Sequence, residues 1–213
     1  MSDQLTEFVT TVELLDGRHA SLRRLTADDA EAVMGLHQNL SDHDRYLRFF
    51  TLRPAHLDQL VSNLIAPGKR QCALGAFDAD RRIGLANYVV STDHGVAEIA
   101  IVVAYEDHLL GVGTALLRRL AQIGRSHGIR RLVADVMAEN RPVLKVASDL
   151  GRPVEPLSDG SVHHLVIELP QSSTEALVAA NELSETRSAK CVRPQRETKY
   201  SLASMARPSL MPL

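Results

Sequence analysis

Aromatic side chains are scarce in this chain of 213 residues, where they make up 4% of the sequence, and tryptophan is absent. The core must therefore be built from Leu, Ile and Val, and such an aliphatic core is typical of proteins in which strands alternate with helices. Cysteine is also scarce, because Cys72 and Cys191 are the only two. Two widely spaced cysteines argue against a disulfide framework and against a metal cluster, so we expect a reducing compartment and a cytoplasmic protein.

Long apolar runs and an excess of positive charge are missing as well. No stretch reaches the ~18 apolar residues that a membrane span needs, and the first eight residues lack the features of a secretory signal. The chain has 24 Lys and Arg against 26 Asp and Glu, which gives a net charge of −2. These absences predict a soluble protein that binds neither nucleic acid nor membrane.

The composition of the chain changes near Pro170. Residues 171–213 are rich in Ser, Thr, Arg and Pro and show little periodic hydrophobicity. We therefore expect one domain over residues 1–170 and a poorly ordered C-terminal tail over residues 171–213.

Hydrophobic periodicity within residues 1–170 predicts a mixed order of strands and helices. Asp16-Gly17 marks a turn between the first two strand segments, Thr26 and Asp29 form a box-like helix start, Ser41 caps a second helix, and Pro54 opens a third. The expected strands are 11–15, 19–25, 71–77, 83–91, 96–103, 132–137 and 162–169, and the expected helices are 27–40, 42–50, 54–64, 111–127 and 141–150. This order predicts an α/β (α+β) domain with a central mixed, mostly antiparallel sheet flanked by helices.

The most informative segment is the point where an apolar strand stops and Gly111-Val112-Gly113-Thr114 begins a helix. Backbone N–H groups at a helix start are unpaired, and glycines let a phosphate approach them, so this segment predicts an anion site. A Walker loop would need Lys where Thr114 stands, and a dinucleotide fingerprint would need Gly where Leu116 stands. Tight helix–strand packing by the two glycines is the alternative interpretation.

His108-Leu109-Leu110-Gly111-Val112-Gly113 resembles the acetyl-CoA-binding motif Q/R-x-x-G-x-G/A of the GNAT N-acetyltransferases. The predicted strand order is the one that this fold would give. Asp16-Gly17 and the segment Arg45-Tyr46-Leu47-Arg48-Phe49-Phe50 look like the GNAT domain of bacterial Pat-type protein lysine acetyltransferases. The resemblance covers residues 12–169 and implies acetyl-CoA as co-substrate and no metal.

The resemblance also implies where acetyl-CoA binds. The pantetheine arm would pair with a strand backbone, and the pyrophosphate would lie on the amides of the glycine turn. His108 stands where the family has Gln or Arg, and Leu110 stands where Arg or Lys is common, so charge is missing from the turn while the amides remain. The expected cofactor-binding residues are Ile101, Val102, Val103, His108, Leu109, Leu110, Gly111, Val112, Gly113, Thr114 and Asn140.

Glu98 is the candidate catalytic residue. From composition alone it could equally be an exposed or arginine-paired carboxylate. An acceptor amine with a pKa near ~10.4 must lose a proton before it attacks a thioester. In Pat-like enzymes the catalytic Glu has the sequence context of Ala97-Glu98-Ile99-Ala100, so the resemblance implies that Glu98 is the general base. The N–H of Val103 would stabilise the oxyanion, and the Tyr acid of many GNAT enzymes is absent because Ala147 occupies its position.

Four further sets of residues carry predictions. Asn140 is expected to cap a helix, and the resemblance adds a contact with pantetheine. The resemblance places the segment of Arg45 and Arg48 beside the acceptor cleft and implies that these arginines bind acidic surface on a protein acceptor. The alternative is an amphipathic helix whose aromatic residues pack inward. Cys72 is expected in the core, and His163 and His164 should face opposite sides of a strand and share no metal.

We therefore expect a transferase of the acyltransferase class that moves acetyl from acetyl-CoA to an amine, with a protein lysine as the acceptor. A small-molecule amine as acceptor and a non-catalytic acyl-CoA-binding sensor are the alternatives. A homodimer is compatible with the sequence.

Overall fold

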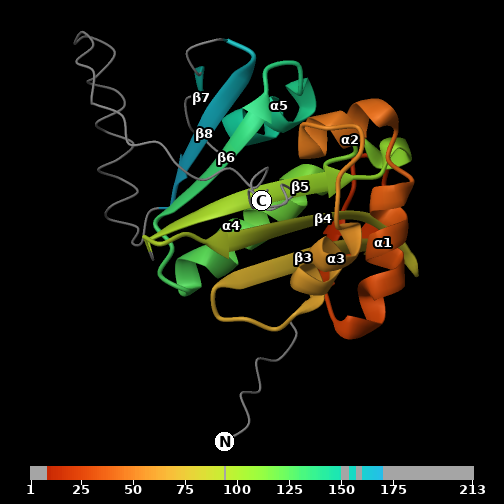
Figure 1. Ribbon diagram of the computed structural model, residues 1–213. Helices are drawn as coiled ribbons and strands as arrows, with labels where there is room; N and C mark the ends of the chain where they lie inside the picture. Colours follow the sequence, from red (N-terminus) through yellow and green to blue (C-terminus); the bar gives the residue numbers. More distant parts are fainter. Residues whose placement is uncertain (1–8, 94, 150–153, 157–159, 170–213) are drawn as a thin grey trace, which may run out of the picture.

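The fold was analysed in a computed structural model that describes residues 9–93, 95–149, 154–156 and 160–169 (Figure 1). The described strands form one sheet in the order β1-β2-β3-β4-β5-β6-β8-β7. Their bounds are β1 Thr10–Glu13, β2 His19–Arg24, β3 Gln71–Asp78, β4 Arg81–Val90, β5 Val96–Val103, β6 Arg131–Met137, β7 Val154–Pro156 and β8 Val162–Glu168. All neighbouring strands are antiparallel except β5 and β6, which confirms the predicted mixed sheet.

The helices follow the predicted order, but α1 begins at Ala30, after a 3-10 turn, and α3 begins at Leu57, each three residues later than predicted. They are α1 Ala30–Gln38, α2 Asp42–Phe49, α3 Leu57–Ile65, α4 Val112–Ser126 and α5 Arg141–Asp149, with short 3-10 turns at Ala27–Asp29 and Tyr105–Asp107. Ser41 caps α2 as predicted, because its Oγ accepts from the Asp44 N–H at 3.0 Å. The prediction that Pro54 opens α3 is wrong, because His56 precedes the helix in the left-handed region at φ 62°.

The sequence did not predict strand β7, and the structure does not describe the predicted tail. β7 is only three residues long, which is too short to show an alternating pattern. The predicted tail over residues 171–213 lies outside the described residues.

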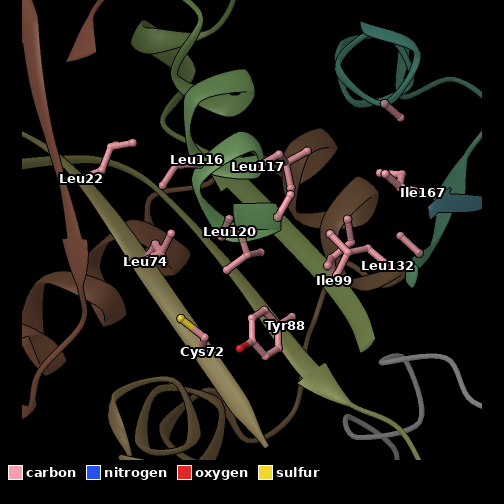
Figure 2. Close-up of a cluster of buried hydrophobic side chains, with 14 of the residues drawn as sticks. Leu22, Cys72, Leu74, Tyr88, Ile99, Leu116, Leu117, Leu120, Leu132 and Ile167 are labelled. Atoms are coloured by element: carbon pink, nitrogen blue, oxygen red, sulfur yellow. The ribbon is translucent and has the colours of Figure 1, made fainter. Parts of the chain in front are cut away.

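Two hydrophobic clusters lie on opposite faces of the sheet. Figure 2 shows the cluster under α4, with Leu22, Leu74, Leu116 and Leu120, and with Cys72 at 3% exposure as the predicted core residue. The other cluster joins α1 and α3 to the sheet and contains Leu25, Val33, Leu64, Leu85 and Val102. Helices therefore cover both faces, and β5 runs between the two layers in the middle of the sheet (Figure 1).

Candidate active site

The parallel pairing of β5 with β6 is brief. It joins Val96, Ala97 and Glu98 to Arg131, Leu132 and Val133 and does not continue beyond that point, whereas the opposite edge of β5 stays paired with β4 as far as Val103. The N–H of Ala104 donates to Ile83 of β4 at 2.9 Å, which fixes the alternation of main-chain groups along β5. The two strands therefore part beyond Glu98, and one edge of β5 lies open.

This alternation decides which residues of β5 offer hydrogen bonds at the open edge. The main-chain groups of Ile99, Ile101 and Val103 point away from β4, while those of Val102 point toward it. Of the three residues predicted to pair with a ligand, Ile101 and Val103 therefore turn their main-chain groups to the open edge and Val102 does not.

A cleft of about 470 Å³ occupies the gap between β5 and β6 and extends to α2, the first turn of α4, and α5. Arg45 and Leu110 do not line it. The predicted residues that do line it are Arg48, Glu98, Ile101, Val102, Val103, His108, Leu109, Gly111, Val112, Gly113, Thr114 and Asn140. The fold therefore brings most of the predicted site residues to one cavity.

The glycine turn presents its amides to this cleft. Gly111 has φ 88°, a left-handed conformation that glycine adopts without strain, and it is the N-cap of α4. The first hydrogen bond of the helix runs from the Ala115 N–H to the Gly111 carbonyl at 3.0 Å. The N–H groups of Val112, Gly113 and Thr114 consequently have no acceptor within the helix. Such a cluster of amides at a helix start is suited to a phosphate group.

His108 and Leu110, the two departures from the family motif, face different surroundings. The Nε2 atom of His108 lies 3.0 Å from the Val103 carbonyl oxygen, so the ring donates a hydrogen bond back to the end of β5. Leu110 packs against the core, and its carbonyl accepts from the Leu15 N–H at 3.1 Å. His108 therefore steadies the cleft edge, whereas Leu110 anchors the turn to the β1–β2 hairpin.

A buried ion network, which the sequence analysis did not predict, holds the loop between β5 and α4. Asp107 is 1% exposed and accepts from Arg18 at 2.9 Å and from Arg81 at 2.7 Å and 2.9 Å. Burial alone would raise the pKa of Asp107, but the hydrogen bonds from Arg81 and Arg18 lower it below its ordinary value. Because these residues come from separate turns, no sequence period could indicate their contact.

Glu98 shares its sheet face with Ala100 and Val102, which is the face that α1 to α3 cover. Arg48 of α2 lines the same cleft. Burial lowers the pKa of Arg48 to about 10, and the negative charge of Glu98 acts in the opposite direction. The candidate base thus lies within the electrostatic influence of a half-buried guanidinium.

Arg45 has a different environment from Arg48. Its guanidinium donates to the carbonyls of Gln38 at 3.1 Å and Leu40 at 2.9 Å and pairs with Asp42 at 2.9 Å. It therefore satisfies carbonyl groups at the C-terminal end of α1. Of the two predicted acceptor-binding arginines, only Arg48 reaches the cleft.

Strand β6 also contributes a carboxylate to the cleft. Asp135 lines the cleft and lies 2.7 Å from His164 Nδ1, and it shares a sheet face with Glu98 because Glu98 is in register with Val133. Asn140 Oδ1 accepts from the Val143 N–H at 3.3 Å, which confirms its role as the cap of α5.

Ala147 is 4% exposed and lines the cleft where many family members have Tyr. Within the described part of the chain, no group of three metal-ligating side chains is present, and no helix is long and apolar enough to cross a membrane.

The cleft thus combines an open strand edge, a turn of amides without helical acceptors and a carboxylate at the far end of the strand, features that suit an extended, phosphate-bearing molecule. The family described as the acetyltransferase (GNAT) family matches residues 36–151. Acetyltransferase PA5475 of Pseudomonas aeruginosa is 30% identical over 141 residues, which cover 64% of this chain and 76% of that protein. The chain belongs to the GNAT acetyltransferase family.

Solved structures agree with this assignment. The GNAT domain of S. lividans PAT is 28% identical, with a TM-score of 0.70, and the match covers 76% of this chain and 97% of that domain. The structure of yncA from Salmonella typhimurium with its cofactor acetyl-CoA is 16% identical, with a TM-score of 0.58, over 72% of this chain and 96% of that chain. The predicted fold is confirmed, and the protein is an acetyl-CoA-dependent N-acetyltransferase.

Proposed function

We propose that this enzyme acetylates lysine side chains of proteins and that Glu98 is its general base. The observation that carries the proposal is the position of Glu98, at the point where β5 and β6 part and within the cleft that holds the glycine turn. The similarity to the GNAT domain of S. lividans PAT supports the choice of acceptor, because the sequence resembles Pat-type lysine acetyltransferases.

The cleft suits acetyl-CoA in three places. The main-chain groups of Ile101 and Val103 would pair with the amides of the pantetheine arm. The amides that begin α4, with Thr114 beside them, would hold the pyrophosphate. Since His108 and Leu110 supply no fixed positive charge, these main-chain donors would do most of the binding.

The acetyl transfer needs few side chains. Glu98 takes a proton from the lysine ammonium, whose pKa is ordinarily ~10.4, and the freed nitrogen attacks the thioester carbon. The C–S bond then breaks and CoA leaves as a thiolate, which its pKa of ~8.5 permits without an acid at Ala147. The thiolate takes up the second proton that the nitrogen must lose, so the products are the acetylated lysine and CoA in its thiol form. The N–H of Val103, which the sequence led us to expect as a donor to the negative oxygen formed during the attack, lies five residues, or about 17 Å, from Glu98 along β5 and therefore takes no part in this step.

The test is an acceptor screen with isotope-labelled acetyl-CoA, read by mass spectrometry, with CoA release measured in parallel. Protein and peptide lysines form one group of acceptors, and small amines form the other. We expect the label on lysine Nε. Label on small amines alone would contradict the lysine proposal, and binding of acetyl-CoA without CoA release would contradict catalysis.

The same proposal locates the enzyme in the cytoplasm. The support for this location is the low cysteine content, with Cys72 as a free thiol.

A further inference from the structure

Arg48 carries a guanidinium group whose Nε atom is buried and has no hydrogen-bond partner among the described residues. The ring centroid of Phe49 lies 5.0 Å from the guanidinium carbon. Arg18, Arg23 and Arg82, by contrast, all pair with aspartates. A buried donor without a partner is unfavourable, and Arg48 lines the substrate cleft.

The charged and titratable groups around Arg48 do not supply that partner. His37 of α1 is fully buried, and its pKa is lowered to about 4, first by burial and then by the charge of Arg48, so it is neutral at pH 7. Asp44, one turn earlier on α2, accepts from Ser41 Oγ at 2.7 Å. Glu98 is the remaining anion that acts on Arg48, and its negative charge opposes the effect of burial on the pKa of Arg48.

We propose that Arg48 binds a carboxylate of the acceptor, so that the enzyme selects amines with a carboxylate close to the reacting nitrogen. This inference rests on the proposed function, in which the amine is positioned at Glu98. A guanidinium is planar and offers two parallel N–H donors, a geometry that matches a carboxylate.

The position of Arg48 along the cleft separates this role from phosphate binding. The charge of Arg48 acts at Glu98, and Glu98 lies five residues, or about 17 Å, from Val103 along β5. The amides that begin α4 lie beyond Val103. The acetyl end of acetyl-CoA, and hence the acceptor, is therefore the part of the complex that meets Arg48.

A bound carboxylate would also assist the proton transfer. The positive charge of Arg48 favours the ionised form of Glu98 and so opposes its uptake of a proton. A carboxylate on Arg48 cancels that charge, after which Glu98 accepts the proton of the ammonium group more readily. The preferred acceptor should therefore show a higher kcat in addition to a lower KM.

A second pocket, lined by apolar side chains and by several amide side chains, adjoins Arg48. It measures about 80 Å³ and is lined by Arg48 together with Gln59, Asn63, Gln71 and Asn87. Amide side chains can bind polar atoms of an acceptor, but they carry no charge that could neutralise Arg48.

The test compares two pairs of acceptors that differ only in one carboxylate. L-Lysine against L-lysinamide tests an α-carboxylate, and the blocked dipeptides acetyl-Glu-Lys-amide and acetyl-Gln-Lys-amide test an acidic neighbour in a protein. CoA release gives kcat and KM for the native enzyme, for Arg48→Gln, for Arg48→Lys and for the control Arg53→Gln, which removes an exposed charge outside the cleft. We expect at least one pair to show a preference of about 10- to 100-fold for the carboxylate, the worth of a charge-assisted hydrogen bond.

That preference should vanish in Arg48→Gln, survive in part in Arg48→Lys and remain whole in Arg53→Gln. Equal kcat/KM within both pairs in the native enzyme would overturn the proposal, as would an equal loss for both members of each pair in Arg48→Gln. If no acceptor is turned over, lysine acetylation fails, and calorimetric binding of the same four compounds to the CoA complex decides the role of Arg48. A carboxylate-dependent affinity that Arg48→Gln abolishes supports the proposal, and its absence overturns it.

Discussion

Glu98, Arg48 and His37 form a series of electrostatic interactions from the cleft into the core. The charge of Glu98 acts on Arg48, and the charge of Arg48 acts on His37. Each residue lies on a different element, β5, α2 and α1 respectively, so the series runs from the cleft to the helix layer on that face of the sheet. Single substitutions in this series should change stability and activity in separable ways.

His37 should make the stability of the fold depend on pH. Its pKa is about 4 in the folded protein against an ordinary 6.5, so the unfolded chain binds more protons between these values and stability falls as pH is lowered from 6.5 to 4. The loss due to His37 is about 3 kcal/mol over this range. Urea unfolding at several pH values gives the free energy of unfolding as a function of pH. Between pH 4 and 6.5 this free energy should change less with pH in His37→Gln than in the native protein, whereas His43→Gln, at an exposed position, should show the native dependence. An identical dependence in all three proteins would contradict the assignment.

At the level of elements, the start of α4 and the loop before it matter most for acetyl-CoA. The helix begins at a left-handed glycine, and the preceding loop is tied to the β1–β2 and β3–β4 hairpins through Asp107. The turn that would bind pyrophosphate is therefore held by α4 on one side and by the contacts of Asp107 on the other. Two pairs of substitutions separate binding from stability.

Gly111→Ala should weaken acetyl-CoA binding about tenfold, because a Cβ at φ 88° strains the turn and displaces an amide donor. Gly128→Ala is the matched control, since Gly128 also has a positive φ of 78° but does not line the cleft. Both substitutions should cost about 1–2 kcal/mol of stability. Calorimetry with acetyl-CoA distinguishes them, and equal affinities for the two variants would refute a role for the glycine turn in binding.

Asp107→Asn should destabilise the protein by about 3 kcal/mol and weaken acetyl-CoA binding, because two arginines lose a buried partner and the loop loosens. Asp29→Asn is the control: Asp29 is equally buried and pairs with Arg23 and Arg82 away from the cleft. Thermal unfolding should show a lower melting temperature for both variants, whereas titration with acetyl-CoA should show a weaker affinity only for Asp107→Asn. An unchanged affinity in Asp107→Asn would show that the network serves stability alone.

Because the pKa of Asp107 is lowered in the folded protein, the stabilisation that Asp107 provides depends on pH. Its contribution is present above the unfolded pKa of about 3.9 and is lost as pH falls through the lower folded value. The difference in stability between Asp107→Asn and the native protein should therefore shrink below about pH 4.

For the molecule as a whole, the sequence was sufficient where structure follows local patterns. Alternating and helical periodicity predicted the long strands and helices, and the glycine spacing located the cleft at α4. It was insufficient where contacts join distant turns, as in the Asp107 network. The same holds for Arg45 and Arg48, which lie three residues apart on α2 but have different environments: one binds helix carbonyls and the other reaches the cleft. The start of α3 and the short β7 lacked any periodic signal.

The proposed domain over residues 1–170 predicts that residues 171–213 contribute nothing to folding or catalysis. The matched S. lividans domain, which aligns over 97% of its own length with 76% of this chain, supports that boundary. A chain that ends at residue 170 should retain the native melting temperature within a few degrees, and its kcat/KM should be unchanged. A large loss of either quantity would assign the last 43 residues to the working enzyme.

The central claim is that Glu98 deprotonates the acceptor amine, and Glu98→Gln tests it most directly because it keeps the shape and removes the base. Two quantities are measured for the native enzyme and for Glu98→Gln: the kcat with a lysine acceptor and the Kd of acetyl-CoA. We predict a kcat lower by about 10²- to 10⁴-fold at an unchanged Kd. A Glu98→Gln enzyme that keeps full turnover with the same Kd would contradict the account.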